Sequence, residues 1–152
     1  FMSFSTIPHR ENGQEILYSW FNLLRTAGVA VEAFLGGSYV GETSFSVPNG
    51  SAGSVTGLVF DKVSVNSAII SVTIARSTNA DERITNGFLK AYYKPSTLSW
   101  ILVDELSGEF DDGITFDINS SGQVTYISDT LTGTGYSGKM LFKAVTFGVY
   151  GL

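Results

Sequence analysis

The stretch from Gly108 to Phe147, GEFDDGITFDINSSGQVTYISDTLTGTGYSGKMLFKAVTF, restricts the fold more than any other part of the chain. Residues 114–118 alternate apolar and polar side chains, so one face of an extended strand is apolar. The sequence NSSG at 119–122 is typical of a turn, and the same alternation resumes at 123–126. These features predict a β-hairpin whose apolar face covers a core.

Short runs with a period of two recur through most of the chain and are separated by turn signals such as Pro48-Asn49-Gly50. The runs are residues 38–47, 55–60, 68–75, 87–94, 98–103 and 139–147, and the two hairpin strands add to them. No helical pattern lies between these runs, and parallel strands need such crossovers. The sequence therefore predicts a mainly β fold, an antiparallel β-sandwich or jelly-roll-like domain.

The N-terminal part follows a different period. Residues 3–13 are expected to form an extended arm, and a 4-3-4 spacing of apolar residues then begins at Leu17 and predicts one α-helix that ends at Gly36-Gly37. The apolar seam that would bring copies of the chain together contains Leu17, Trp20, Phe21, Leu24, Val31 and Leu35. Two parts are expected: an arm and oligomerisation or attachment helix over 1–36, and a β-sandwich over 37–152. The alternative is an amphipathic helix that lies on its own sheet, because fewer than three heptads is short for a coiled coil.

Composition limits the kinds of partner that the chain is expected to bind. The net charge is -5 with nine Lys and Arg residues dispersed along the chain, which disfavours nucleic acid as a partner. We find no signal peptide and no apolar run of about 18 residues, so insertion into a membrane is not expected. Charged residues make up only 15% of the chain, and many Ser and Thr residues replace them, which suits a subunit that shelters part of its surface in an oligomer.

Sequence motifs for catalysis, metal binding or cofactor binding are weak in this chain. The chain has no Cys and one histidine, His9, so neither a catalytic triad nor a zinc site is expected. The segment 133–138, GTGYSG, matches the dinucleotide fingerprint G-x-G-x-x-G, but a strand pattern follows it where a helix is required. The sequence predicts no catalytic residue, no metal site and no cofactor.

Two loop regions are candidate sites. The Gly-rich segment 133–138 and the turn at Pro48-Asn49-Gly50 supply candidate ligand contacts, which are Asn49, Thr134, Tyr136 and Ser137. Glu109, Asp111, Asp112 and Asp117 form an acidic turn and strand face that could bind a hard cation through oxygens, although a solvated turn is the simpler interpretation.

Aromatic residues on one predicted hairpin suggest a contact surface. Phe88 and Tyr92 share a face with Lys90 and Lys94, and Trp100 lies on the partner strand. Such a face would suit sugar stacking or a protein interface, and we favour a subunit interface because it is the commoner role.

Two runs resemble a known class of virion proteins. The runs are IPxRxxGQxI at 7–16 with WFNxLR at 20–25, and GxxxDGITFxI at 108–118 with GQVxY at 122–126, GTGY at 133–136 and FKA at 142–144. They resemble the opening segment and the terminal β domain of tail-fibre and receptor-binding proteins of tailed bacteriophages. Related trimeric fibres of phage origin also serve bacteria as adhesins.

The resemblance implies a non-enzymatic homotrimer within the virion, assembled in the bacterial cytoplasm. Its N-terminal arm would dock onto other virion subunits, and the β domain would face a glycan or protein on the host surface. The chain has no long repetitive shaft, so a short fibre, a tip or a decoration subunit is expected. The alternatives are a decoration or baseplate component without a receptor, and an envelope-glycan hydrolase acting through Asp111, Asp112 or Asp117.

Overall fold

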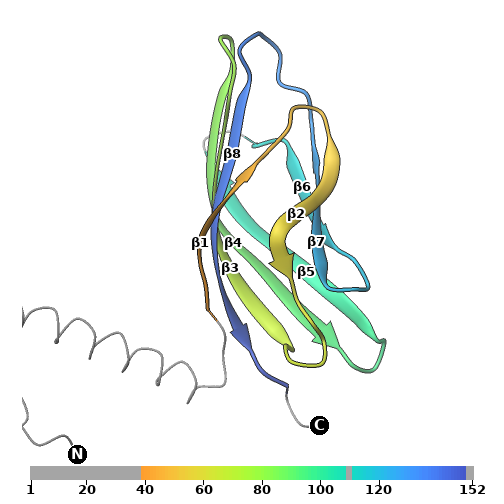
Figure 1. Ribbon diagram of the computed structural model, residues 1–152. Helices are drawn as coiled ribbons and strands as arrows, with labels where there is room; N and C mark the ends of the chain where they lie inside the picture. Colours follow the sequence, from red (N-terminus) through yellow and green to blue (C-terminus); the bar gives the residue numbers. More distant parts are fainter. Residues whose placement is uncertain (1–38, 109–110, 150–152) are drawn as a thin grey trace, which may run out of the picture. The chain divides into compact units, whose positions relative to one another are not determined.

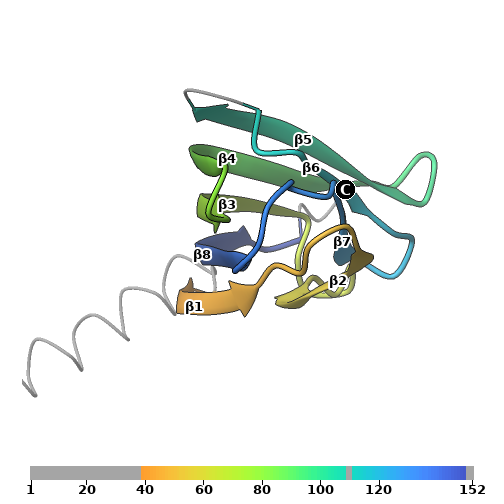
Figure 2. The ribbon, with the colours of Figure 1, turned by 90° about the horizontal axis from the view of Figure 1, so that it is seen from above.

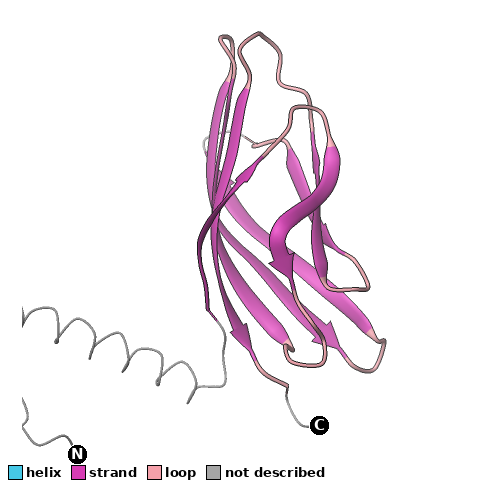
Figure 3. Cartoon of the chain, viewed as in Figure 1, coloured by secondary structure: helices cyan, strands magenta, loops and turns pink. Residues whose placement is uncertain are grey.

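The computed structural model describes residues 39–108 and 111–149 (Figure 1). They form eight strands: β1 (Tyr39–Ser46), β2 (Ala52–Val59), β3 (Ser67–Ser77), β4 (Glu82–Lys94), β5 (Ser99–Gly108), β6 (Ile114–Ile118), β7 (Gln123–Ser128) and β8 (Ser137–Phe147). No helix occurs in this part of the chain (Figure 3). The helix predicted within 1–36 and its seam residues lie outside the described residues and stay predictions.

The strands form two antiparallel sheets, which confirms the mainly β, antiparallel part of the predicted fold class. One sheet has the order β1-β8-β3-β4-β5, and the other has the order β2-β7-β6. The first two strands pair with the last two, β1 with β8 and β2 with β7, in different sheets. Figure 2 shows the two sheets facing each other across the domain. The division into five and three strands arises because β3, β4 and β5 continue as a meander within one sheet.

The predicted hairpin between residues 114 and 126 is confirmed. Phe116 on β6 lies opposite Tyr126 on β7, and Ile118 lies opposite Val124. The turn between them is closed by a hydrogen bond from the Gly122 N–H to the Asn119 carbonyl. Gly122 has a φ of 82°, in the left-handed region where a side chain is strained, which explains glycine at this position.

The core lies between the sheets and is built from the inward-facing half of each alternating run. In β3 the buried apolar side chains are Ala68, Ile70, Val72 and Ile74, while the residues between them face outward. They form one apolar cluster with residues of β2, β6, β7 and β8. Because a single cluster includes both sheets, burial of apolar surface holds the sandwich together.

Several strands are longer than the sequence predicts. β3 and β4 continue beyond the predicted runs 68–75 and 87–94 and remain paired as far as Ser77 and Glu82, so the loop between them is residues 78–81. β5 continues past Val103 to Gly108, paired with β4. The backbone pairing of these strands extends beyond their apolar alternation, because the paired residues nearest the loops are mostly polar.

Candidate functional site

The loops that follow β1, β3 and β7 gather at one end of the domain, together with the segment after β5. The β-ladders place them there, since Ser46 pairs with Lys139, Ser77 with both Glu82 and Ser137, and Ile114 with Ser128. Tyr39 pairs instead with Val145, at the other end. Figure 1 shows this arrangement, with the β3–β4 and β7–β8 loops at the top. We call residues 47–51, 78–81, 111–113 and 129–136 the loop end.

A buried arginine holds the loop end together. Arg76, near the end of β3, is 1% exposed. Its guanidinium donates hydrogen bonds to the Asp112 carbonyl at 2.6 Å, to Oδ1 of Asp129 at 2.7 Å and to the Tyr136 hydroxyl at 3.2 Å. Burial opposes the charge of Arg76, but the hydrogen bonds with Tyr136 and Asp129 outweigh it and raise its pKa. One charged group thereby connects the segments after β5 and β7.

A second arginine links the same segments from a more exposed position. Arg83, on β4 opposite Arg76, donates to the Asp81 carboxylate, to Oδ2 of Asp129 and to the Asp111 carbonyl. The Asp129 carboxylate therefore accepts bonds from both arginines. This shared acceptor fixes the path of the loop between β7 and β8.

The four candidate ligand residues divide into two pairs at this end. Asn49 uses its amide to bind the main chain of Leu131, and the Tyr136 hydroxyl donates to the Val47 carbonyl. Both are half-buried, whereas Thr134 and Ser137 are exposed. The fold thus occupies the polar groups of Asn49 and Tyr136, and Thr134 and Ser137 remain open to solvent. Ligand binding by this loop stays a prediction.

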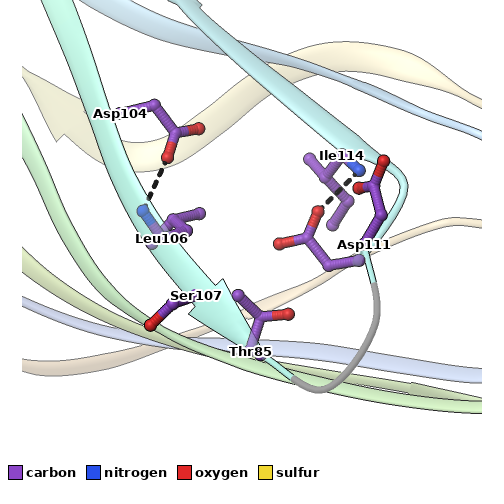
Figure 4. A pocket seen from close by; sticks show the side chains of 8 residues that line it. Thr85, Asp104, Leu106, Ser107, Asp111 and Ile114 are labelled. Carbon is purple, nitrogen blue, oxygen red and sulfur yellow. Dashed lines mark hydrogen bonds between the residues drawn. The ribbon is translucent and has the colours of Figure 1, made fainter.

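A groove opens beside the loop end, between the last part of β5 and the start of β6 (Figure 4). Its volume is about 390 Å³, which lies within the range of roughly 300–1,000 Å³ typical of small-molecule pockets. The residues that line it are Thr85, Asp104, Leu106, Ser107, Gly108, Asp111, Asp112 and Ile114. We call it the acidic groove, because three of these described lining residues are Asp and none is Lys or Arg.

Asp112 is buried, whereas Asp104 and Asp111 are exposed. Asp112 is 5% exposed, and its Oδ1 accepts a 2.8 Å hydrogen bond from the Ile114 N–H. Burial raises the pKa of its carboxyl, and the neighbouring charges of Asp111 and Asp104 add to this rise; the Ile114 N–H and Arg76 oppose it without reversing it. A carboxyl with a raised pKa in a groove is a candidate for proton transfer or for ligand binding.

The acids predicted from sequence do not form one group. Asp111 and Asp112 lie in the groove, but Asp117 is exposed on β6 and does not line it. Asp104 and Thr85 were missed. A signal for Asp104 exists in the sequence, because the residue follows Trp100 and Leu102 at every second position and so belongs to the inward-facing series of β5. The same signal exists for Thr85, which precedes Leu89 and Ala91 at every second position on the inward-facing side of β4.

The predicted aromatic face is confirmed in part. Phe88 and Tyr92 are exposed on the outer face of the five-stranded sheet, near Ile69 and Val103 of the neighbouring strands. The placement of Trp100 with them was wrong: it is 6% exposed and packs against Phe60 and Tyr93 in the core. Trp100 pairs directly with Tyr93, whose side chain faces inward, so pairing places both on the core side. The role of the outer face as an interface stays a prediction.

The described part of the chain contains neither a metal-ligand cluster nor a membrane-spanning helix. No three His, Cys, Asp or Glu side chains within 39–108 and 111–149 are placed to hold a metal ion. Nor does this part of the chain contain a helix long and apolar enough to cross a bilayer.

Comparison with known proteins gives one distant structural likeness. The sequence matches no protein-family model and no curated protein. The fold is similar to part of the Acinetobacter phage vB_ApiP_P1 tailspike protein, with a TM-score of 0.37 and 14% sequence identity. The match covers 74% of this chain and 21% of the tailspike chain, so the chain spans about a fifth of that protein's length.

Proposed function

We propose that this chain is a non-enzymatic structural and binding subunit of a phage or phage-like appendage, a trimeric short fibre or tip that attaches to a host surface. The observation that carries the proposal is the separation of the two ends of the β domain. Tyr39, where the chain enters, lies at one end, and the loop end lies at the other. A domain attached through residues 1–38 would present the loop end outward. The sequence resemblance to tail-fibre and receptor-binding proteins supports the same role.

The loop end suits presentation because its backbone is fixed while its outer side chains are exposed. Arg76 and Arg83 both bind the Asp129 carboxylate and also the backbone carbonyls of Asp112 and Asp111, which lowers the entropy lost when a partner binds. Thr132, Thr134 and Ser137 are exposed hydroxyls on this end. Hydroxyl groups donate and accept hydrogen bonds, as contacts with a glycan or with a polar protein surface require.

Binding to cells tests the proposal. Fluorescently labelled full-length chain would be mixed with envelope preparations from a panel of bacterial strains, and bound protein would be measured after washing. We expect retention on a subset of strains. Thr134→Arg at the loop end should weaken retention, whereas Ser120→Arg, on the turn at the opposite end, should not. Retention on no strain, or equal loss in both variants, would argue against outward presentation of this end.

The trimeric state is a separate part of the proposal. Light scattering of the full chain should give about 49 kDa, three times the 16.3 kDa of one chain. A mass of one chain at high protein concentration would contradict it.

Hydrolysis of an envelope glycan is the second candidate function, favoured by the raised pKa of Asp112 in the acidic groove. A general acid in glycoside hydrolysis needs such a carboxyl. This function requires release of saccharide from envelope polysaccharide, retained in Asp117→Asn and lost in Asp112→Asn. A third role, a decoration or baseplate component without a receptor, requires virion incorporation together with no retention on any strain.

A further inference from the structure

Among the described residues, the lining of the acidic groove carries several acidic side chains and no Lys or Arg. Asp104, Asp111 and Asp112 contribute three carboxylates, and none of the residues that line the groove is Lys or Arg. Arg76 lies nearby, but its donors point to Asp112 O, Gly113 O, Asp129, Asn49 and Tyr136. A positively charged ligand would therefore meet carboxylates that no lining cation neutralises.

Each carboxylate in the groove has one oxygen committed to the fold. Oδ1 of Asp104 accepts from the Leu106 N–H at 3.0 Å, Oδ1 of Asp111 from the Gly113 N–H at 2.9 Å, and Oδ1 of Asp112 from the Ile114 N–H at 2.8 Å. Within the described residues, no hydrogen bond reaches the second oxygen of any of the three. The backbone thus orients three acceptors whose remaining oxygens can serve a ligand.

The Thr85 hydroxyl is an independent sign of a ligand. Thr85 is 4% exposed, and its Oγ1 has no hydrogen-bond partner in the described part of the chain. Buried hydroxyl groups in proteins nearly always have a partner. Figure 4 shows the Thr85 hydroxyl pointing into the groove, toward the Asp111–Asp112 segment. A polar group held unpaired at the floor of a groove is what a site for a hydrogen-bonding ligand requires.

We propose that the acidic groove binds a saccharide that carries a free amino group. Its ammonium would lie between the Asp104 and Asp112 carboxylates, and a ring hydroxyl would pair with the Thr85 hydroxyl. The side chains of Leu106 and Ile114 offer apolar contact to the C–H face of the ring. The three acids are not placed to hold one metal ion, whereas an ammonium and several hydroxyls form separate bonds. The inference rests on the proposed function, since it names the receptor class.

Calorimetric titration of the full-length chain with a glucosamine tetramer tests this assignment. We expect binding that weakens as salt is added, because the contact is a partly exposed charge pair. The fully N-acetylated tetramer, which keeps the shape and loses the charge, should not bind. Asp104→Asn should weaken the affinity for the glucosamine tetramer about tenfold, as expected for loss of one charge-assisted hydrogen bond.

Matched variants separate the groove from general surface charge. Asp117→Asn removes the same charge from an exposed site outside the groove, and we expect wild-type affinity. Thr85→Val keeps the shape of the side chain and should also weaken binding. No binding by the wild type, equal binding of the N-acetylated tetramer, equal weakening by Asp117→Asn, or equally tight binding of lysine amide would each overturn the assignment.

Retention on bacterial envelopes, measured in parallel, distinguishes the two proposals. If Asp104→Asn is retained as well as the wild type, the groove is not the receptor site and the proposed attachment function stands. If the tetramer binds the wild-type groove and no envelope retains the chain, the attachment function fails instead.

Discussion

The Nη1 atom of Arg76, on β3, donates a hydrogen bond of 2.7 Å to Oδ1 of Asp129, in the loop before β8. The Arg76 side chain is completely buried, and that of Asp129 is 48% exposed. A buried guanidinium is tolerable only when its donors are satisfied, and here backbone carbonyls after β5 and β7 complete the set. The loop end is therefore organised around one buried charge.

Removal of the Arg76 charge should destabilise the folded protein. Arg76→Met leaves buried carbonyls without a donor, and we expect the free energy of unfolding to fall by about 3 kcal/mol. Urea unfolding followed by fluorescence measures it. Arg83→Met is the matched control, since Arg83 also binds Asp129 but is partly exposed, and it should cost less than about 1 kcal/mol. Equal losses would show that burial of Arg76 has no special role.

Asp112 should make stability depend on pH. Its raised pKa means that the folded protein holds this proton more tightly than the unfolded chain does. Ionisation as pH rises above the ordinary value of 3.8 therefore disfavours the folded state. Asp112→Asn cannot ionise, and its side-chain oxygen can still accept from the Ile114 N–H. The variant should gain stability relative to the wild type as pH rises from about 4 to 7 in urea titrations. A difference in the free energy of unfolding between Asp112→Asn and the wild type that shrinks as pH rises would contradict this.

Thr85 should tolerate loss of its hydroxyl. Thr85→Val removes an unpaired buried polar group at constant shape, so we expect unchanged stability or a gain of up to about 1 kcal/mol in thermal unfolding. Ser128→Ala is the contrasting variant, because the Ser128 hydroxyl, equally buried, donates a 2.7 Å bond to the Pro48 carbonyl. It should lose about 1 kcal/mol. A loss of that size for Thr85→Val would indicate a partner for its hydroxyl.

Assembly should depend on the predicted seam. Leu24→Asp places a charge where helices are expected to meet, and the mass in solution should fall toward 16.3 kDa. Far-UV circular dichroism should retain the β signal, because Leu24 lies outside the eight strands. A Glu11→Gln variant, outside the seam, is expected to assemble as the wild type does. An unchanged mass for Leu24→Asp would mean that the helix packs elsewhere.

The alternating runs determined the fold class because a strand buried on one side must repeat every second residue. All eight strands fall where the pattern places them, and the segments from Ile114 to Tyr126 form the predicted hairpin. Strand ends were predicted less well, since the β3–β4 ladder continues through Arg76 and Arg83 to Ser77 and Glu82 after the apolar pattern stops. Backbone hydrogen bonds, which the apolar pattern does not reveal, set those ends.

What only the tertiary structure decided is which distant residues meet. The sequence determined that Asp111 and Asp112 share a turn, but the addition of Asp104 and Thr85 to them depends on β5 and β6 lying beside each other in different sheets. Likewise, Arg76 lies just past the predicted run 68–75, and Trp100 was grouped with the exposed aromatic residues. Their burial follows from the register of β3 with β4 and of β4 with β5. Local pattern fixes the face that each side chain takes, whereas sheet pairing over long sequence separations fixes what it faces.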